Sequence, residues 1–218
     1  MNIDYTYSSP NYSVGRNGHS PSVIVNHITA GLMPGCLTWL CNPDSQASSH
    51  YLIAKTGIVY QLVCDNNTAW TCGDVQKPTW PLLEPGMNPN TISLNIEHEA
   101  LSPWEALTEP QYEASLALHR MLCAKHFIPQ DALHIIGHSA LNSQSRANDP
   151  GPLFPWERLI RDLNQSVLIR VNGTTADTDA RLEQGRTWVP IRFIEQLGYS
   201  VQWNSPNIID IRPTRTKA

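Results

Sequence analysis

The chain has 218 residues, a net charge of −4 at neutral pH, 41% hydrophobic residues and 16% charged residues. This composition is that of an ordinary globular protein and excludes extended disorder. Because the chain is acidic and has no run of Lys or Arg, we expect no nucleic-acid partner.

Three further features concern the membrane and the compartment. No stretch approaches the ~20 apolar residues of a membrane span, so we expect no membrane insertion. Residues 1–12 lack the charged and apolar regions of a secretory signal, which predicts synthesis in the cytoplasm. Five cysteines, an odd number, fit a reducing compartment, and the spacing of Cys36 and Cys41 leaves their pairing open.

Short β-branched or alternating apolar runs predict the first strands. Residues 23–25 form one such run, which ends at Asn26 and His27. Residues 50–53 and 58–63 are separated by Lys55-Thr56-Gly57, a pattern typical of a hairpin. Residues 91–97 alternate in polarity, so Ile96 should be buried and Glu97 should point the other way.

Further along, helices alternate with one more strand. Thr108 and Gln111 have the capping-box spacing, and the apolar positions that follow predict a helix to about Lys125. Residues 133–136 read as a buried strand that ends at Gly137-His138, and residues 156–163 as a helix.

The sequence pattern changes at residues 164–166. Strands are predicted at 167–171, 188–191, 200–203 and 208–211, with a helix at 192–197 closed by Gly198. We therefore expect two domains, residues 1–165 and a small α+β unit at residues 166–218.

Two of the eight histidines are candidates for a metal site. His27 and His138 each follow a short apolar strand, where a side chain can emerge into a cleft. Zinc hydrolases use three protein ligands and keep one position open. Asp149, on a loop eleven residues after His138, could supply the third ligand, or it could simply initiate the turn at Pro150-Gly151.

Several blocks of residues then resemble a known family. They occur in family order over about residues 20–163: Val23 to Ala30, Ser48 to Tyr51, Gly57 to Gln61, Ala69-Trp70, Ser93 to Glu97, and Gly137-His138-Ser139 through Asp149-Pro150-Gly151. Together these blocks resemble the type 2 N-acetylmuramoyl-L-alanine amidases. The resemblance implies an α/β fold with a mixed central β-sheet flanked by helices. It also implies a Zn2+ ion held by His27, His138 and Asp149, and peptidoglycan as the substrate.

The resemblance assigns further roles. Glu97 is the candidate general base, although it could also be a solvated carboxylate at a strand end; the family block reads Ser-Ile-Gly-Ile where this chain has Ser-Leu-Asn-Ile. Many relatives carry Lys at the position of Ala147, so Arg146 is the candidate for stabilising the oxyanion. Thr71 stands where relatives often have His.

Two residues are assigned to the substrate groove. Trp70 is expected to form a wall of the groove or else part of the core, and His50 is expected to support the groove rather than bind zinc. Serine-hydrolase chemistry at Ser139 is disfavoured, because Leu141 replaces the closing glycine of the G-x-S-x-G motif.

Residues 166–213 resemble the stalk domain named after copper amine oxidases, without a copper site because no His follows His138. Such a unit would target the cell wall or form a homodimer; Trp188 and Trp203 would stack on sugars or belong to the core. The leading functional prediction is a phage or prophage endolysin that acts on the wall after host lysis or holin-type export. The alternatives are a cytoplasmic muropeptide-recycling amidase and a non-catalytic peptidoglycan-binding module.

Overall fold

The structure is a computed structural model that describes residues 3–164, 170–171, 174–175, 181–183, 186–189, 191, 193–205 and 208–213. The chain divides into two compact units, residues 1–163 and 164–218. Within the described residues, no helix is both long and apolar enough to cross a membrane.

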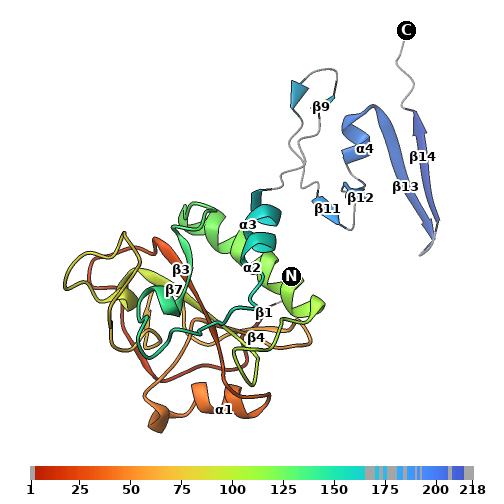
Figure 1. Ribbon diagram of the computed structural model, residues 1–218. Helices are drawn as coiled ribbons and strands as arrows, with labels where there is room; N and C mark the ends of the chain where they lie inside the picture. Colours follow the sequence, from red (N-terminus) through yellow and green to blue (C-terminus); the bar gives the residue numbers. More distant parts are fainter. Residues whose placement is uncertain are drawn as a thin grey trace. The chain divides into compact units, whose positions relative to one another are not determined.

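A mixed six-stranded sheet forms the centre of the first unit (Figure 1). Its strand order is β1-β5-β4-β7-β3-β8, and the neighbours β4, β7, β3 and β8 run parallel. The strands are β1 (Ile3–Asp4), β3 (Val23–Ile28), β4 (Tyr51–Ile53), β5 (Val59–Gln61), β7 (Ser93–His98) and β8 (Ile135–Gly137). The carboxyl ends of the parallel strands therefore meet at one edge, where sites in such sheets form.

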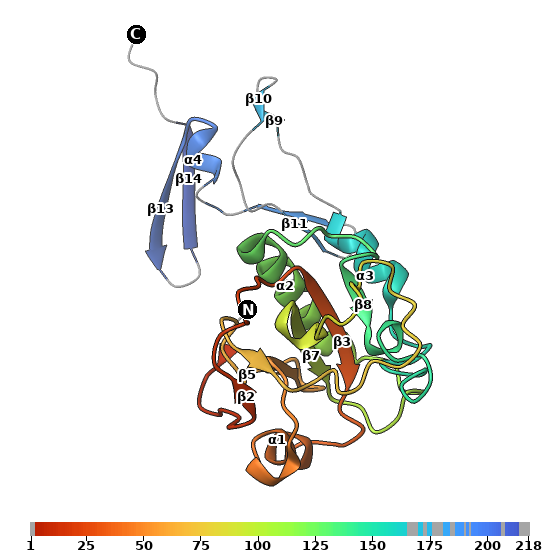
Figure 2. The same ribbon diagram turned by 90° about the vertical axis from the view of Figure 1, so that its left-hand side faces the viewer.

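Helices cover both faces of this sheet, as the family resemblance implied. The core on one face joins Ile24, Leu94 and Ile96 of the sheet to α2 (Glu109–His126) and α3 (Trp156–Asn164). The short helix α1 (Gly35–Leu40) packs its Leu37 and Leu40 against the opposite face, and Figure 2 shows it on the side away from α2.

The helix and hairpin signals of the sequence are confirmed. Thr108 caps α2 by accepting a hydrogen bond from the Gln111 backbone N–H, and the helix ends at His126, one residue after the predicted end. β4 and β5 pair as the predicted hairpin, with Gly57 at φ +86° in the turn, a conformation that glycine adopts without strain.

Other boundaries differ from the prediction. β3 continues to Ile28, so Asn26 and His27 lie within the strand rather than after it, while β7 begins only at Ser93. α1 was not predicted, and neither were the two-residue strands β1, β2 (Tyr12–Ser13) and β6 (Thr68–Ala69). Three 3-10 turns complete the unit, at Pro43–Ser45, Pro89–Thr91 and His138–Ala140.

The described residues of the second unit form three antiparallel pairs and one helix, which agrees with an α+β unit. The pairs are β9 (Arg170–Val171) with β10 (Thr174–Thr175), β11 (Arg181–Glu183) with β12 (Arg186–Trp188), and β13 (Tyr199–Ser205) with β14 (Ile208–Pro213). Helix α4 (Phe193–Gln196) is followed by Gly198 at φ +83°, as predicted. The strand expected at 188–191 is wrong in its bounds, because β12 ends at Trp188. The side chains of Trp188 and Trp203 lie outside the described residues.

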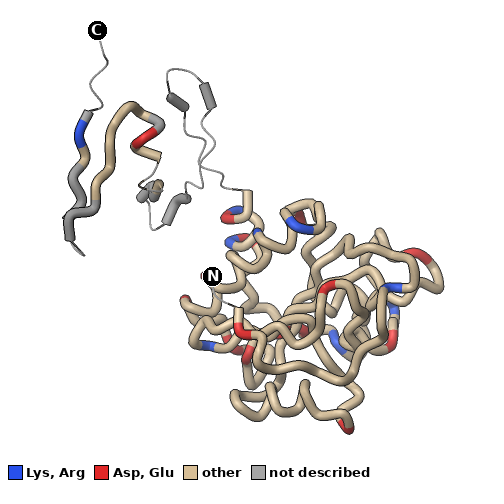
Figure 3. The backbone as a smooth tube through the Cα atoms, turned by 180° about the vertical axis from the view of Figure 1, so that it is seen from behind, with Lys and Arg blue, Asp and Glu red and all other residues tan. Residues whose placement is uncertain are grey.

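The first unit carries charges of both signs and all five cysteines of the chain. In Figure 3, positively and negatively charged residues are scattered along the first unit. All five cysteines, including Cys36 and Cys41, are free thiols in the structure.

Candidate active site

A cavity of about 470 Å³ lies at the carboxyl ends of the parallel strands. It brings together six of the residues predicted from the sequence to be functional. These lining residues are His27, Trp70, Glu97, His138, Arg146 and Asp149. The predicted metal ligands and the predicted base therefore share one opening.

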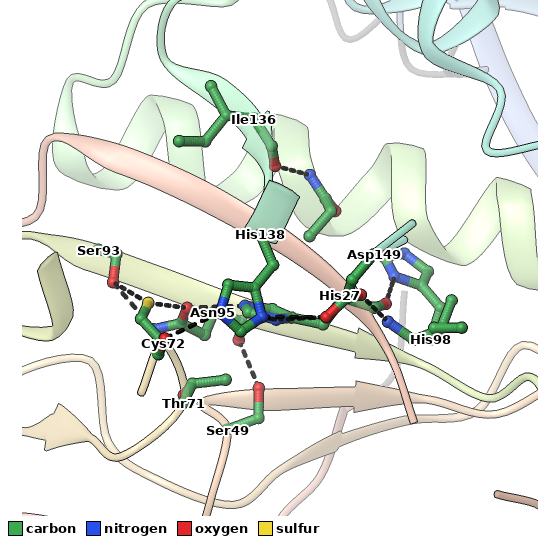
Figure 4. A network of polar contacts seen from close by, with 12 residues as sticks. His27, Ser49, Thr71, Cys72, Ser93, Asn95, His98, Ile136, His138 and Asp149 are labelled. Carbon is green, nitrogen blue, oxygen red and sulfur yellow. Dashed lines mark hydrogen bonds and ion pairs between the residues drawn. The ribbon is translucent and has the colours of Figure 1, made fainter. Parts of the chain in front are cut away.

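Three side chains converge inside this cavity (Figure 4). His27 Nδ1 lies 3.1 Å from His138 Nδ1. Asp149 Oδ2 lies 3.6 Å from His27 Nδ1 and 3.0 Å from His138 Nδ1. Both rings are buried, and the carboxylate is largely buried. Two imidazole nitrogens and one carboxylate oxygen form a donor set that suits zinc, and three ligands leave one coordination position open.

Asp149 reaches the histidines because its loop folds back over β8. Its main-chain oxygen accepts a hydrogen bond from the Ser139 N–H at 2.9 Å, and its Oδ1 accepts one from the Ile28 N–H at 2.9 Å. Gly137 permits this path, since a Cβ there would lie 2.8 Å from Pro150 Cδ and 3.1 Å from Asp149 O. The alternative role of Asp149 as a turn initiator is thus compatible with its position beside the histidines.

The outer nitrogens of both rings also have partners. His27 Nε2 lies 3.0 Å from Asn95 Oδ1, and His138 Nε2 lies 2.8 Å from the main-chain oxygen of Cys72. The Nδ1 atoms are therefore the ones that face the shared site. Both contacts join residues remote in sequence, so the local sequence pattern does not indicate them.

Electrostatics distinguishes the two carboxylates of the cavity. Burial raises the pKa of Glu97 well above its usual value, Asp149 adds to this effect, and Arg146 partly opposes it. Glu97 Oε2 is buried and has no hydrogen-bond partner in the described part of the chain. Burial alone would raise the pKa of Asp149 as well, but its contacts with His138 and His27 outweigh burial and lower it.

Three cavity residues bear on substrate contact. Trp70 is 37% exposed and lines the cavity, so it is a wall residue and not a core aromatic. Trp39 on α1 is 57% exposed and also lines the cavity. It was missed because α1 itself was not predicted. Thr71, the second departure from the family pattern, lines the same cavity.

His50, assigned from the sequence to the substrate groove, does not line the cavity and is not placed to contact a substrate there. Its side chain is fully buried, and its Nδ1 accepts a hydrogen bond from the Asn95 backbone N–H at 3.1 Å. Burial and the adjacent guanidinium of Arg16 lower the pKa of His50 to about 3, so the ring is neutral and able to accept. His50 thus contacts β7 at Asn95 from outside the cavity.

Ser139 lies in the 3-10 turn after β8 and is not among the residues lining the cavity. The serine-hydrolase alternative therefore has no support from the geometry.

Two histidines, an aspartate and a separate glutamate lie in an open cavity at the carboxyl ends of the parallel strands. This arrangement defines the class of protein as a hydrolase. Residues 17–152 match the family described as N-acetylmuramoyl-L-alanine amidase, and the chain belongs to this family. Residues 160–209 match the copper amine oxidase N-terminal domain.

Individual relatives agree with this assignment. N-acetylmuramoyl-L-alanine amidase A of Achromobacter lyticus is 28% identical over 72% of this chain and 90% of its own length. The 1,6-anhydro-N-acetylmuramyl-L-alanine amidase AmpD of Salmonella typhimurium is 28% identical over 69% of this chain and 84% of its own length.

Solved structures show the same fold. A crystal structure of an AmpD derivative superposes with a TM-score of 0.57 at 25% identity, over 75% of this chain and 99% of that chain. The amidase LysC from Clostridium intestinale superposes with a TM-score of 0.54 at 24% identity, over 75% of this chain and 98% of that one.

Proposed function

We propose that the chain is a zinc-dependent amidase that cleaves the bond between N-acetylmuramic acid and L-alanine in peptidoglycan. The observation that carries this proposal is the convergence of His27, His138 and Asp149 beside Glu97 in one open cavity. Membership of the amidase family and a solved complex of Escherichia coli AmiD with a muramyl peptide support the substrate.

The donor set fits zinc, with Nδ1 of each histidine and Oδ2 of Asp149 as the ligand atoms. When bound, zinc supplies Lewis acidity toward the scissile carbonyl and the attacking water. The half-buried Ile28 N–H holds the other carboxylate oxygen, so Asp149 is fixed before any ligand arrives.

Glu97 takes the proton of the attacking water and returns it to the nitrogen of the departing alanine. Its carboxylate lines the cavity, and no hydrogen bond to Oε2 from the described residues competes for the proton. Desolvation, which raises its pKa, makes it a stronger proton acceptor than a solvated carboxylate.

Arg146 is the cation available to the tetrahedral oxyanion. It is exposed, lines the cavity and lowers the pKa of Glu97 by its charge. A guanidinium offers fixed donors to developing negative charge, which suits the role that the family's lysine would otherwise fill. Ala147 at the lysine position is not among the lining residues.

As the biological role we propose wall lysis by a phage or prophage endolysin, synthesised in the cytoplasm and acting after release. The appended unit supports this role, since it would target the wall or form a homodimer. The similarity to AmpD supports a second candidate, the recycling of soluble muropeptides.

Release of products from two substrates tests both roles. The full chain is incubated with intact cell walls and, separately, with soluble anhydromuropeptides, each with and without a zinc chelator. We expect chelator-sensitive release of alanine amino termini from walls. Activity on the soluble substrate alone would favour recycling, and no activity on either would overturn the proposed function.

Asp149→Ala provides the matched metal-site control, because it removes one ligand while leaving Glu97 and Arg146 in place. We expect it to lose both zinc and activity. A variant that keeps both would show that Asp149 is not the third ligand.

A further inference from the structure

Resting on the proposed zinc site, we infer that Asn95 is a positioning residue that sets the tautomer of His27 and thereby its capacity to bind zinc. The residue lies in the centre of β7, directly opposite Val25 of β3. It is fully buried and does not line the cavity, so it acts through His27 and not on the substrate.

The first step concerns which nitrogen of His27 carries the hydrogen. Nδ1 faces His138 Nδ1 and Asp149 Oδ2, so ligation requires its lone pair to be free. The hydrogen must then be bonded to Nε2. Because His27 is only 1% exposed, this N–H group needs an acceptor within the protein. Asn95 Oδ1, 3.0 Å away, is that acceptor.

The second step concerns which end of the Asn95 amide faces the ring. Its Nδ2 donates to Ser93 Oγ at 2.9 Å, and its Oδ1 also accepts from Cys72 Sγ at 3.3 Å. In the opposite orientation the NH2 group would point at His27 Nε2 and move the ring hydrogen to Nδ1, where it would block ligation. The Cys72 thiol, as a donor to Oδ1, favours the orientation in which the oxygen faces the histidine, and Ser93 Oγ accepts from the Nδ2 group in that orientation (Figure 4).

The main chain of Asn95 is held as firmly as its side chain. Its N–H donates to His50 Nδ1 at 3.1 Å, and its carbonyl oxygen accepts from Ser49 Oγ at 2.9 Å. His50 therefore contributes to the site indirectly, because it fixes the position of the β7 backbone from which Asn95 reaches His27.

The two histidine ligands are oriented by different means. His138 Nε2 faces a main-chain carbonyl, which can only accept, so its tautomer is independent of any side chain. His27 depends on one amide side chain at a position where the family block reads glycine. A substitution at Asn95 should therefore affect His27 and leave His138 unchanged.

The test compares zinc affinity in four forms of the full chain: wild type, Asn95→Leu, Asn95→Asp and Asn26→Leu. Leucine is close in size to asparagine but cannot accept, whereas aspartate keeps an acceptor and Ser93 can donate to it. Asn26 is the matched control, a fully buried asparagine next to His27 whose Nδ2 bonds the Ile136 carbonyl instead. Affinity is measured by competition with a chromophoric chelator.

We expect Asn95→Leu to bind zinc about 10- to 100-fold more weakly than wild type, the usual cost of removing such a partner. Asn95→Asp should bind at least as tightly as wild type, since a carboxylate raises the basicity of the ligand. Unchanged affinity in Asn95→Leu, or an equal loss in Asn26→Leu, would overturn the inference.

A second readout needs neither zinc nor activity. Nitrogen-15 NMR of the metal-free protein reports the tautomer of each histidine; we expect His27 protonated on Nε2 in wild type and Asn95→Asp but not in Asn95→Leu. His138 should stay protonated on Nε2 in all of them. If wild type bound no zinc, the proposed function would fail, while the His27 tautomer would still decide the role of Asn95.

Discussion

Glu97 lies directly opposite His27 in the parallel pairing of β7 and β3. Residues paired in this way point to the same face of a sheet, so the base and a metal ligand enter one cavity from two adjacent strands. Regular strands, and not mobile loops, fix their separation, which is how rigid catalytic geometry is commonly achieved.

This relationship predicts the effect of Glu97→Gln. The amide keeps the size of the side chain but cannot take a proton, so we expect kcat to fall about 10²- to 10⁴-fold. Zinc content should be retained, because Glu97 is not a ligand. Steady-state kinetics and metal analysis check both expectations, and a variant with near-normal kcat would remove Glu97 from the mechanism.

A second prediction concerns the loop that carries Asp149. Gly137→Ala would place a Cβ 2.8 Å from Pro150 Cδ, and the loop must shift to relieve this contact. We expect zinc affinity to fall roughly 10- to 100-fold, as when the support of a ligand is disturbed. Ser139→Ala is the control, since it keeps the main-chain hydrogen bond to Asp149 O. Equal affinity in both variants would contradict the steric argument.

Trp39 provides a third prediction. An exposed indole that lines a substrate cavity is suited to stacking on a sugar ring or on an apolar part of the peptide stem. We expect Trp39→Ala to raise KM about 2- to 10-fold with little change in kcat, from a loss of about 0.5–1.5 kcal/mol. Trp104, 65% exposed and not among the lining residues, is the matched control, and its alanine variant should behave as wild type.

Acid should destabilise the fold through buried histidines. Burial is the main cause that lowers the pKa of His50 and His98 to about 3 and of His119 to about 4, whereas unfolded histidine titrates near 6.5. Below this value the unfolded state binds more protons than the folded state, so stability falls as pH decreases. As pH falls below 6.5, each of these histidines should lower the free energy of unfolding by up to about 1.4 kcal/mol per pH unit, until the pH reaches its pKa in the folded state.

Denaturant unfolding of the metal-free protein between pH 7 and pH 4.5 measures this loss. His119→Leu should show a shallower decline, because one of the three groups no longer titrates. His19→Leu, at an exposed position, should keep the slope of wild type. An unchanged slope in His119→Leu would contradict the prediction.

Local signals were sufficient for much of the fold. The Thr108 cap, the Gly57 turn and the alternating residues of β7 act over a few neighbouring residues, so they can be read without a structure. The second unit was recognised in the same way, through its turns and its helix closed by Gly198. Short elements were missed because α1, six residues long, and strands of two residues carry too little periodicity.

The sequence by itself determined which residue types could form the site: two histidines after apolar strands, an aspartate on a returning loop, and a glutamate on the intervening strand. Only the tertiary structure decided their arrangement. Contacts between residues remote in sequence bring Asp149 over Gly137 and turn the amide of Asn95 toward His27. The same folding buries His50 and leaves Trp39 exposed. Burial and hydrogen-bond direction depend on neighbours that the chain supplies only after it has folded.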